Sequence, residues 1–255
     1  MTAKSPALAR LLSNAAPQRS APFSVGSVGL EVAILFDTTG SMTPYLQQVR
    51  QDLARLASDL WCAVPGARLA LIAYQDYCSL SAYVTRVHPF TVSVESVRSF
   101  LDQVEPTAGT DPAEAVEEAL HQASVLPWSV GARRVAILVG DAPPHGVIDG
   151  WHRCRNGHTY LTEANALAAK GIVVYAVQCG SCAATQQSFR EIARITGGKH
   201  ISLGAIDDLV DLLAAISIQR AGLLPAFIGK LEATGRLSSS KQALLAQLRA
   251  GEAEQ

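Results

Sequence analysis

Blocks of consecutive apolar residues alternate along the chain with stretches in which apolar residues recur every three or four positions. Blocks of strand length that are apolar on both faces predict buried parallel strands, and they lie at 32–36, 69–74, 135–139 and 172–177. Apolar positions at helical spacing predict helices that begin near Thr43, Val94, Asp111, Thr162 and Gln186. This alternation predicts an α/β fold with a doubly wound, mostly parallel sheet and helices on both faces.

Two other features complete the predicted sheet and its helices. Alternation of apolar and polar residues from Tyr83 to Val87 predicts an antiparallel edge strand, joined to its neighbour by a hairpin. A short strand over 200–203 and a helix over 207–218 follow later in the chain. The run from Asp111 to Glu114 has the N-cap, proline and returning carboxylate of a capping box, so we expect a helix to begin at Asp111.

The chain divides into three predicted segments. Residues 1–29 form a flexible arm of mixed Ser, Pro and Ala, residues 30–219 form the main domain, and residues 220–255 form a helical extension. The extension has apolar positions from Leu223 to Leu231 and again from Lys241 to Leu248 that need burial. We favour packing of these positions against the main domain, and docking on another protein is the alternative.

Composition limits the partners and the compartment. Lys and Arg total 21 against 22 for Asp and Glu, so the net charge of -1 gives no reason to expect a nucleic acid or a membrane surface. No apolar segment has the length of a signal peptide core or a spanning helix. The five cysteines do not form the even framework of a small secreted module. We therefore expect a soluble, cytoplasmic protein.

Only two acidic residues, Asp37 and Asp141, directly end long buried strands and lead into turns rich in Gly or Pro. In parallel sheets, ligands bind at the carboxyl ends of the strands, so both side chains are expected to face one crevice. Thr39 and Ser41 follow Asp37 closely, and Gly40 between them lets the backbone bend. Because all these donors are oxygens, the site favours Mg²⁺, Mn²⁺ or Ca²⁺ over zinc or copper.

The run DTTGS from Asp37 to Ser41 resembles the D-x-[ST]-x-S signature of von Willebrand factor A domains, which is their metal-ion-dependent adhesion site. Thr110 stands where that family has its distal metal-binding threonine, and Asp141 stands where it has a second aspartate. The resemblance extends over about residues 30–219. It implies a Rossmann-like fold and a metal shell of Asp37, Thr39, Ser41, Thr110 and Asp141, which a Glu or Asp of a protein partner completes.

The segments from Asp37 to Met42 and from Gly140 to Gly146 are most similar to the A domains linked to alpha-kinases. No kinase domain follows in this sequence, so the resemblance carries no kinase activity over. It implies a divalent-cation-dependent protein-binding module without enzyme activity. Such a module is an adaptor or subunit that works with a protein such as an ATPase or effector.

Several candidate residues also have a plain structural interpretation. The hydroxyls of the adhesion-site motif and of Thr110 could serve turns or helix caps, and Asp111 is better explained as an N-cap than as a ligand. Asp76 could orient a coordinated water from the second shell or could simply begin a turn. For His145 we expect a loop histidine bonded to the backbone rather than a catalytic base.

The cysteines form a second candidate constellation. Cys179 and Cys182 have the spacing of a zinc knuckle, and Cys154 lies between His152 and His158 in a loop. Zinc held by Cys154, Cys179 and Cys182 is therefore possible on spacing. The loop supplies one cysteine instead of a pair, so we favour buried free thiols over a zinc site.

The enzymatic alternative is a metal-dependent phosphohydrolase of the haloacid-dehalogenase type, which also places an aspartate after its first strand. That family needs a second aspartate two residues later, where this chain has Thr39. It also needs a lysine to neutralise phosphate, and none lies near the predicted crevice before Lys170. We therefore favour the binding module.

Overall fold

In the computed structural model, the residues described are 29–77, 81–107, 112–148 and 154–249, which leaves nearly all of the predicted arm outside. They form one sheet with the strand order β3-β2-β1-β4-β5-β6, in which β3 is antiparallel to β2 and the other neighbours are parallel. The strands are β1 (Leu30–Asp37), β2 (Arg68–Tyr74), β3 (Thr85–Thr91), β4 (Arg133–Gly140), β5 (Ile172–Gln178) and β6 (His200–Ser202). The predicted α/β class and the antiparallel edge strand are confirmed.

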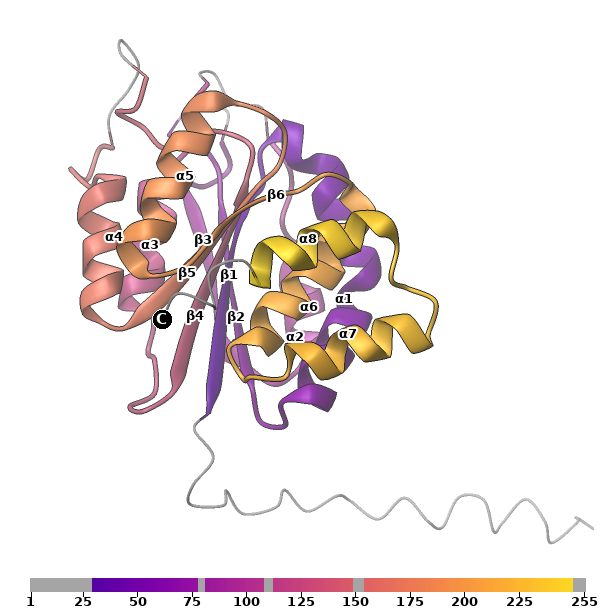
Figure 1. Cartoon of the computed structure of the whole chain (residues 1–255). Coiled ribbons are helices and arrows are strands. Elements are labelled where there is room, and N and C mark those ends of the chain that lie inside the picture. Colours follow the sequence, from indigo (N-terminus) through magenta and orange to yellow (C-terminus); the bar gives the residue numbers. More distant parts are fainter. Residues whose placement is uncertain (1–28, 78–80, 108–111, 149–153, 250–255) are drawn as a thin grey trace, which may run out of the picture.

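Helices cover both faces of the sheet (Figure 1). One face carries α1 (Thr43–Ala63), α2 (Val94–Asp102), α6 (Leu209–Gln219), α7 (Leu224–Ala233) and α8 (Ser239–Arg249). The other carries α3 (Val116–Val125), α4 (Tyr160–Ala169) and α5 (Ala183–Thr196). Two short 3-10 helices, η1 (Gly40–Met42) and η2 (Ile206–Asp208), precede α1 and α6. None of the helices in the described part is long and apolar enough to cross a bilayer.

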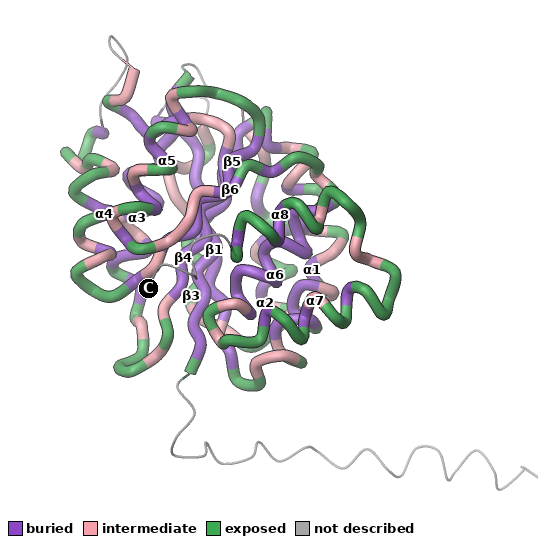
Figure 2. The backbone as a smooth tube through the Cα atoms, in the orientation of Figure 1, coloured by how far each residue is buried: buried purple, intermediate pink, exposed green. Residues whose placement is uncertain are grey.

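Strand β1 lies at the centre of the sheet, and all of its residues are buried. Successive side chains on a strand point to opposite faces, so Val32, Ile34 and Phe36 enter one core while Ala33 and Leu35 enter the other. The tube coloured by burial shows the same concentration of buried residues along the central strands (Figure 2). The continuous apolar runs of the sequence therefore reflect a sheet that is covered on both sides.

The helix expected to begin at Asp111 begins instead at Val116, and the capping box assigned to Glu114 is wrong. The backbone before the helix is bonded to two other loops. The amide of Glu114 donates to the carbonyl of Pro143 at 3.0 Å, and the amide of Ala115 donates to that of Gln75 at 2.9 Å. These long-range bonds hold Glu114 in an extended bridge beside Pro144, which a first helical turn would break. Asp111 itself lies outside the described residues.

The C-terminal helices α7 and α8 pack back onto the domain, as we favoured from the sequence. Both helices contact α6, and α8 also contacts β6. Their apolar positions are buried in the same core as α1 and α6, and they are Leu224, Phe227, Leu231, Leu244, Leu245 and Leu248.

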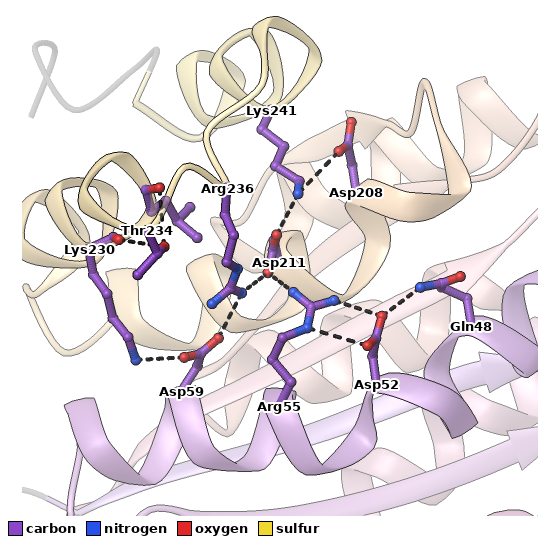
Figure 3. Close-up of polar contacts among 11 residues, drawn as sticks. Gln48, Asp52, Arg55, Asp59, Asp208, Asp211, Lys230, Thr234, Arg236 and Lys241 are labelled. Atoms are coloured by element: carbon purple, nitrogen blue, oxygen red, sulfur yellow. Dashed lines mark hydrogen bonds and ion pairs between the residues drawn. The ribbon is translucent and has the colours of Figure 1, made fainter.

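Ion pairs fasten this extension to α1 and α6 (Figure 3). Asp211 on α6 is buried and contacts Arg55 of α1, Arg236 and Lys241, with Lys241 Nζ at 2.7 Å from its carboxylate. Arg236 also contacts Asp59 of α1 at 3.0 Å. A buried carboxylate with three cationic partners is stable only while those partners remain, so α7 and α8 are electrostatically tied to the domain.

We expect Asp211→Asn to lower the free energy of unfolding by about 1–3 kcal/mol, because it leaves three partly buried cations without their shared anion. Urea denaturation followed by circular dichroism measures this change. The matched control is Asp207→Asn, which alters an exposed aspartate nearby and should change stability by less than about 0.5 kcal/mol. Equal stability of the two variants would contradict the assignment of Asp211 as the anchor.

Candidate functional site

The predicted pair of aspartates meets at the carboxyl ends of two neighbouring strands. Phe36 of β1 is paired with Val139 of β4, so Asp37 and Asp141 follow at adjacent points of the same sheet edge. The strand order changes direction here, because the chain runs from β1 outward to β2 and β3 before it returns to β4 on the other side. This is the position at which open α/β sheets bind ligands.

The turn after β1 gathers three oxygen-bearing side chains. Oδ1 of Asp37 accepts hydrogen bonds from the amide of Thr39 at 2.8 Å and from its hydroxyl at 2.7 Å. The hydroxyls of Thr39 and Ser41 lie 3.5 Å apart. Asp37 and Thr39 are buried while Ser41 is exposed, so the turn places its oxygens in a row from the sheet edge to the surface.

Two carboxylate oxygens at this point have no hydrogen-bond partner among the described residues. They are Oδ2 of Asp37 and Oδ1 of Asp141, and both are shielded from solvent. Burial, followed by the charge of Asp141, raises the pKa of Asp37 from its ordinary value of 3.8 to about 7. Such oxygens fit a bound cation, which would both coordinate them and remove the repulsion between the two carboxylates.

Glu114 is a site residue that sequence analysis missed. Its side chain is buried, and Oε2 has no hydrogen-bond partner among the described residues. Burial raises the pKa of Glu114 to about 10, with further contributions from the charges of Asp37, Asp76 and Asp141. Glu114 therefore belongs to the same acidic group, although its sequence context indicated only a helix cap.

A buried histidine borders this acidic group. Nε2 of His145 lies 3.1 Å from Oδ1 of Asp76, and its Nδ1 lies 3.2 Å from Oε1 of Glu117. Where a backbone partner was expected for His145, the structure has carboxylates at both ring nitrogens. Oδ1 of Asp76 also accepts the amide of Tyr77 at 2.6 Å, so Asp76 both shapes its turn and faces the site.

Gly140 is required where β4 approaches the site. A Cβ at this position would lie 2.4 Å from the hydroxyl of Tyr74 and 3.4 Å from Oδ2 of Asp37. Tyr74 is fully buried, and its hydroxyl donates to the carbonyl of Val139 at 3.2 Å. The hydroxyl of Tyr74 thus lies against Gly140 near the two aspartates, and only glycine at position 140 leaves room for it.

The remaining predicted residues are placed as follows. Thr110 lies outside the described residues, but Thr107 precedes it by three positions and its carbonyl accepts the amide of Gly40 at 2.9 Å. The sulfurs of Cys154, Cys179 and Cys182 do not converge on one point in the described part of the chain, so the predicted cysteine zinc site is not assembled there.

Each of these three cysteines has surroundings of its own. Cys154 accepts the hydroxyl of Tyr77 at 2.9 Å, and Cys182 is exposed at the start of α5. Cys179 lies near the aspartates, and burial followed by the charges of Asp141 and Asp37 raises the pKa of its thiol. His152, which was grouped with Cys154 in the sequence, lies outside the described residues.

The family model for the von Willebrand factor type A domain matches residues 31–212, which include the sheet and the aspartate pair. The chain belongs to this family. VWA domains are protein-interaction and adhesion modules, and most are not enzymes.

Two curated relatives carry the similarity within longer proteins. The alpha-protein kinase vwkA of Dictyostelium discoideum is 29% identical over 119 residues, which are 46% of this chain and 19% of the kinase. A protein of Acanthamoeba polyphaga mimivirus, whose name describes it as ariadne-like with a RING finger, is 23% identical over 197 residues, or 71% of this chain and 19% of that protein. The chain thus spans about a fifth of the length of either relative.

Solved structures support the fold of the VWA domain. The pilus adhesin SpaC of Lactobacillus rhamnosus GG, in its open conformation, has a TM-score of 0.58 at 14% identity and covers 79% of this chain and 31% of its own. An aerotolerance-related membrane protein of Bacteroides fragilis, crystallised with multiple mutations to serines, has a TM-score of 0.52 at 16% identity and covers 75% of this chain and 100% of its own. At these identities the likeness concerns the fold alone.

The raised pKa of Asp37 predicts a pH dependence for the metal-free VWA domain. Between pH 4 and 7 the folded protein keeps a proton on Asp37 that the unfolded chain releases, so stability falls as the pH rises. The wild type should lose stability relative to Asp37→Asn with a slope approaching about 1.4 kcal/mol per pH unit in this window. Urea denaturation with a chelator present, repeated at each pH, measures the difference, and parallel curves would contradict it.

Proposed function

We propose that this VWA domain binds a protein partner through a divalent cation, Mg²⁺ or alternatively Mn²⁺ or Ca²⁺, held by Asp37, Thr39, Ser41, Thr110 and Asp141. The supporting observation is the pair of buried, unpartnered oxygens on Asp37 and Asp141. Hard oxygen donors at a sheet edge suit these ions, and family membership makes an adhesion site the natural use of them.

The chemistry of the site favours an acidic partner. The hydroxyls of Thr39 and Ser41 are neutral ligands, so the ion keeps enough positive charge to attract an incoming carboxylate. Ser41 is exposed, which places the ligand row within reach of a partner from solvent. Asp76 and Glu114 belong to the same acidic group and would orient water coordinated to the ion. The ion would bridge the domain and the partner's carboxylate, and the turn after β1 would hold its ligands in place.

We further propose that the domain acts as a cytoplasmic adaptor or subunit for a protein such as an ATPase or effector, without enzyme activity of its own. Specificity would come from the loops around the ion, because the ion alone accepts any accessible carboxylate. These loops are Met42–Thr43, Gln75–Ser81, Thr107–Thr110 and Ala142–Gly157.

The phosphohydrolase alternative lacks two of its requirements at this site. Thr39 donates to Asp37 at the position where a second aspartate would act as acid or base. Lys170 precedes β5 and donates to the carbonyl of Ser124 at 2.6 Å, so it lies at the opposite ends of the strands from the aspartates. Metal-dependent hydrolysis of a generic phosphate ester that is lost in Asp37→Asn would favour this alternative.

We expect Asp37→Ala and Asp141→Ala each to weaken Mg²⁺ or Mn²⁺ binding by more than about tenfold, since each removes a charged ligand. Isothermal titration calorimetry on the purified protein measures the affinity. Asp102→Ala, which changes an exposed aspartate at the end of α2, is the matched control and should bind as the wild type does. Tight binding by the Asp37→Ala, Asp141→Ala double variant would place the ion elsewhere.

Partner binding should depend on one acidic side chain of the partner. Once a partner has been captured, chelator, Thr110→Ala and conversion of the key Glu or Asp to its amide should each weaken the complex by on the order of 2–5 kcal/mol. Surface plasmon resonance with and without Mg²⁺ measures the affinity of the complex in each case. Binding that survives the chelator and every amide substitution would exclude the cation as the bridge.

A further inference from the structure

A second cluster of ligand-type side chains lies between helices α3 and α4. His121 belongs to α3, Glu163 belongs to α4, and His158 lies just before α4. Nδ1 of His121 is 3.1 Å from Oε2 of Glu163, and Nδ1 of His158 is 2.9 Å from Oε1 of the same carboxylate. The two imidazole rings stack with centroids 4.0 Å apart and an angle of 22° between their planes.

The local sequence fixes these positions. Thr159 caps α4 by accepting the amide of Thr162 at 3.1 Å, while the hydroxyl of Thr162 accepts the amide of Thr159 at 3.1 Å. This capping box sets the direction in which the chain enters the helix, so His158 and Glu163 lie on the side that faces α3. Helices α3 and α4 lie side by side on one face of the sheet (Figure 1). Their packing places His121 beside His158 and Glu163.

Two buried carboxyl groups lie at this cluster. Glu118 and Glu163 are both buried, and Oε2 of Glu118 lies 3.9 Å from Nε2 of His158. Among the ion pairs of the described residues, neither glutamate is paired with a lysine or an arginine. Two buried carboxyl groups whose charged neighbours are imidazoles, which are themselves metal ligands, make a setting that suits a bound cation.

We propose that His121, His158 and Glu163 form a second metal site, for Zn²⁺ or a similar divalent transition ion. Their ligand atoms all lie within 4.8 Å of one another. In a tetrahedral zinc site with bonds near 2.0–2.1 Å, neighbouring ligand atoms are roughly 3.3 Å apart. The separations of 3.1 and 2.9 Å are close to this value. Because the two rings are stacked, they would have to rotate about their side-chain bonds before both nitrogens could point at one ion.

Neighbouring groups suit a site with one open position. Glu118 accepts Asn156 Nδ2 at 3.0 Å and faces Nε2 of His158, as carboxylates do when they orient a metal-binding histidine. Three protein ligands leave one tetrahedral position for water or a further ligand. His158 also lines a hollow of about 600 Å³ together with Cys154, Tyr160 and Ser188, so one of the three ligands borders open space.

This site differs in chemistry from the proposed adhesion site and does not rest on it. Two imidazole nitrogens and one carboxylate select a borderline ion such as Zn²⁺, whereas the all-oxygen set at Asp37 and Asp141 selects Mg²⁺ or Ca²⁺. The ion would join α3 to α4, and so it should stabilise the fold as well as bind.

The test is a zinc titration of the full chain after removal of metals by a chelator. Calorimetry in excess Mg²⁺ should show Zn²⁺ binding with micromolar or tighter affinity, and the melting temperature should rise on addition of zinc. His158→Ala and Glu163→Gln should each weaken zinc binding by at least about 100-fold, because each removes a direct ligand. His121→Gln keeps a polar side chain on α3 and should have the same effect. His88→Ala, which removes a half-buried histidine on β3, is the matched control.

Further measurements separate this site from the alternatives. Co²⁺ should give visible bands of a tetrahedral nitrogen and oxygen site, without the near-ultraviolet thiolate band that ligation by Cys154, Cys179 or Cys182 would produce. Asp37→Ala should lose Mg²⁺ binding and keep zinc binding, so failure at one site is distinguished from failure at the other. Only millimolar zinc binding, or tight binding retained in both His158→Ala and Glu163→Gln, would overturn the proposal. Circular dichroism of each variant in chelator confirms that it is folded.

Discussion

The structure depends on the parallel pairing of β1 with β4, which brings two aspartates together at a buried sheet edge. Two carboxylates that lose their water and face each other are unfavourable, and the raised pKa of Asp37 expresses that cost. The two hydrogen bonds from Thr39 to Asp37 offset only part of this cost, and Glu114 adds a third acid to the group. The fold therefore maintains a buried acidic group, and a divalent cation would remove the repulsion between its carboxylates.

The fold and the main site could be predicted from the sequence where the signal is local. A buried strand that ends in an aspartate before a glycine-rich or proline-rich turn is visible in the residues themselves, and Asp37 and Asp141 were found in this way. Glu114 could not be found in this way, because its position depends on backbone hydrogen bonds. The amide of Glu114 donates to the carbonyl of Pro143, and the amide of Ala115 donates to that of Gln75. Those contacts are set by tertiary packing, which overrode a capping pattern that was locally plausible.

The second cluster shows the same limit of spacing arguments. Cys179 and Cys182 have the spacing of a zinc knuckle. Cys179 is nevertheless buried near the aspartates, whereas Cys182 is exposed at the start of α5. The chain leaves the sheet after β5, so the side chains of Cys179 and Cys182 lie in different surroundings. His121 and Glu163 are 42 positions apart in the sequence, and only the packing of α3 against α4 brings them together.

Helix α3 connects the two acidic regions. Three glutamates at its start face different partners, because Glu114 faces the aspartate pair, Glu117 faces His145, and Glu118 faces His158. The amino end of a helix carries partial positive charge, which stabilises nearby carboxylates and offsets part of the cost of burying them. The late start of α3 at Val116 thus has an electrostatic consequence, since it places Glu117 and Glu118 in the first turn. A helix that began at Asp111 would have moved this favourable end away from Glu117 and Glu118.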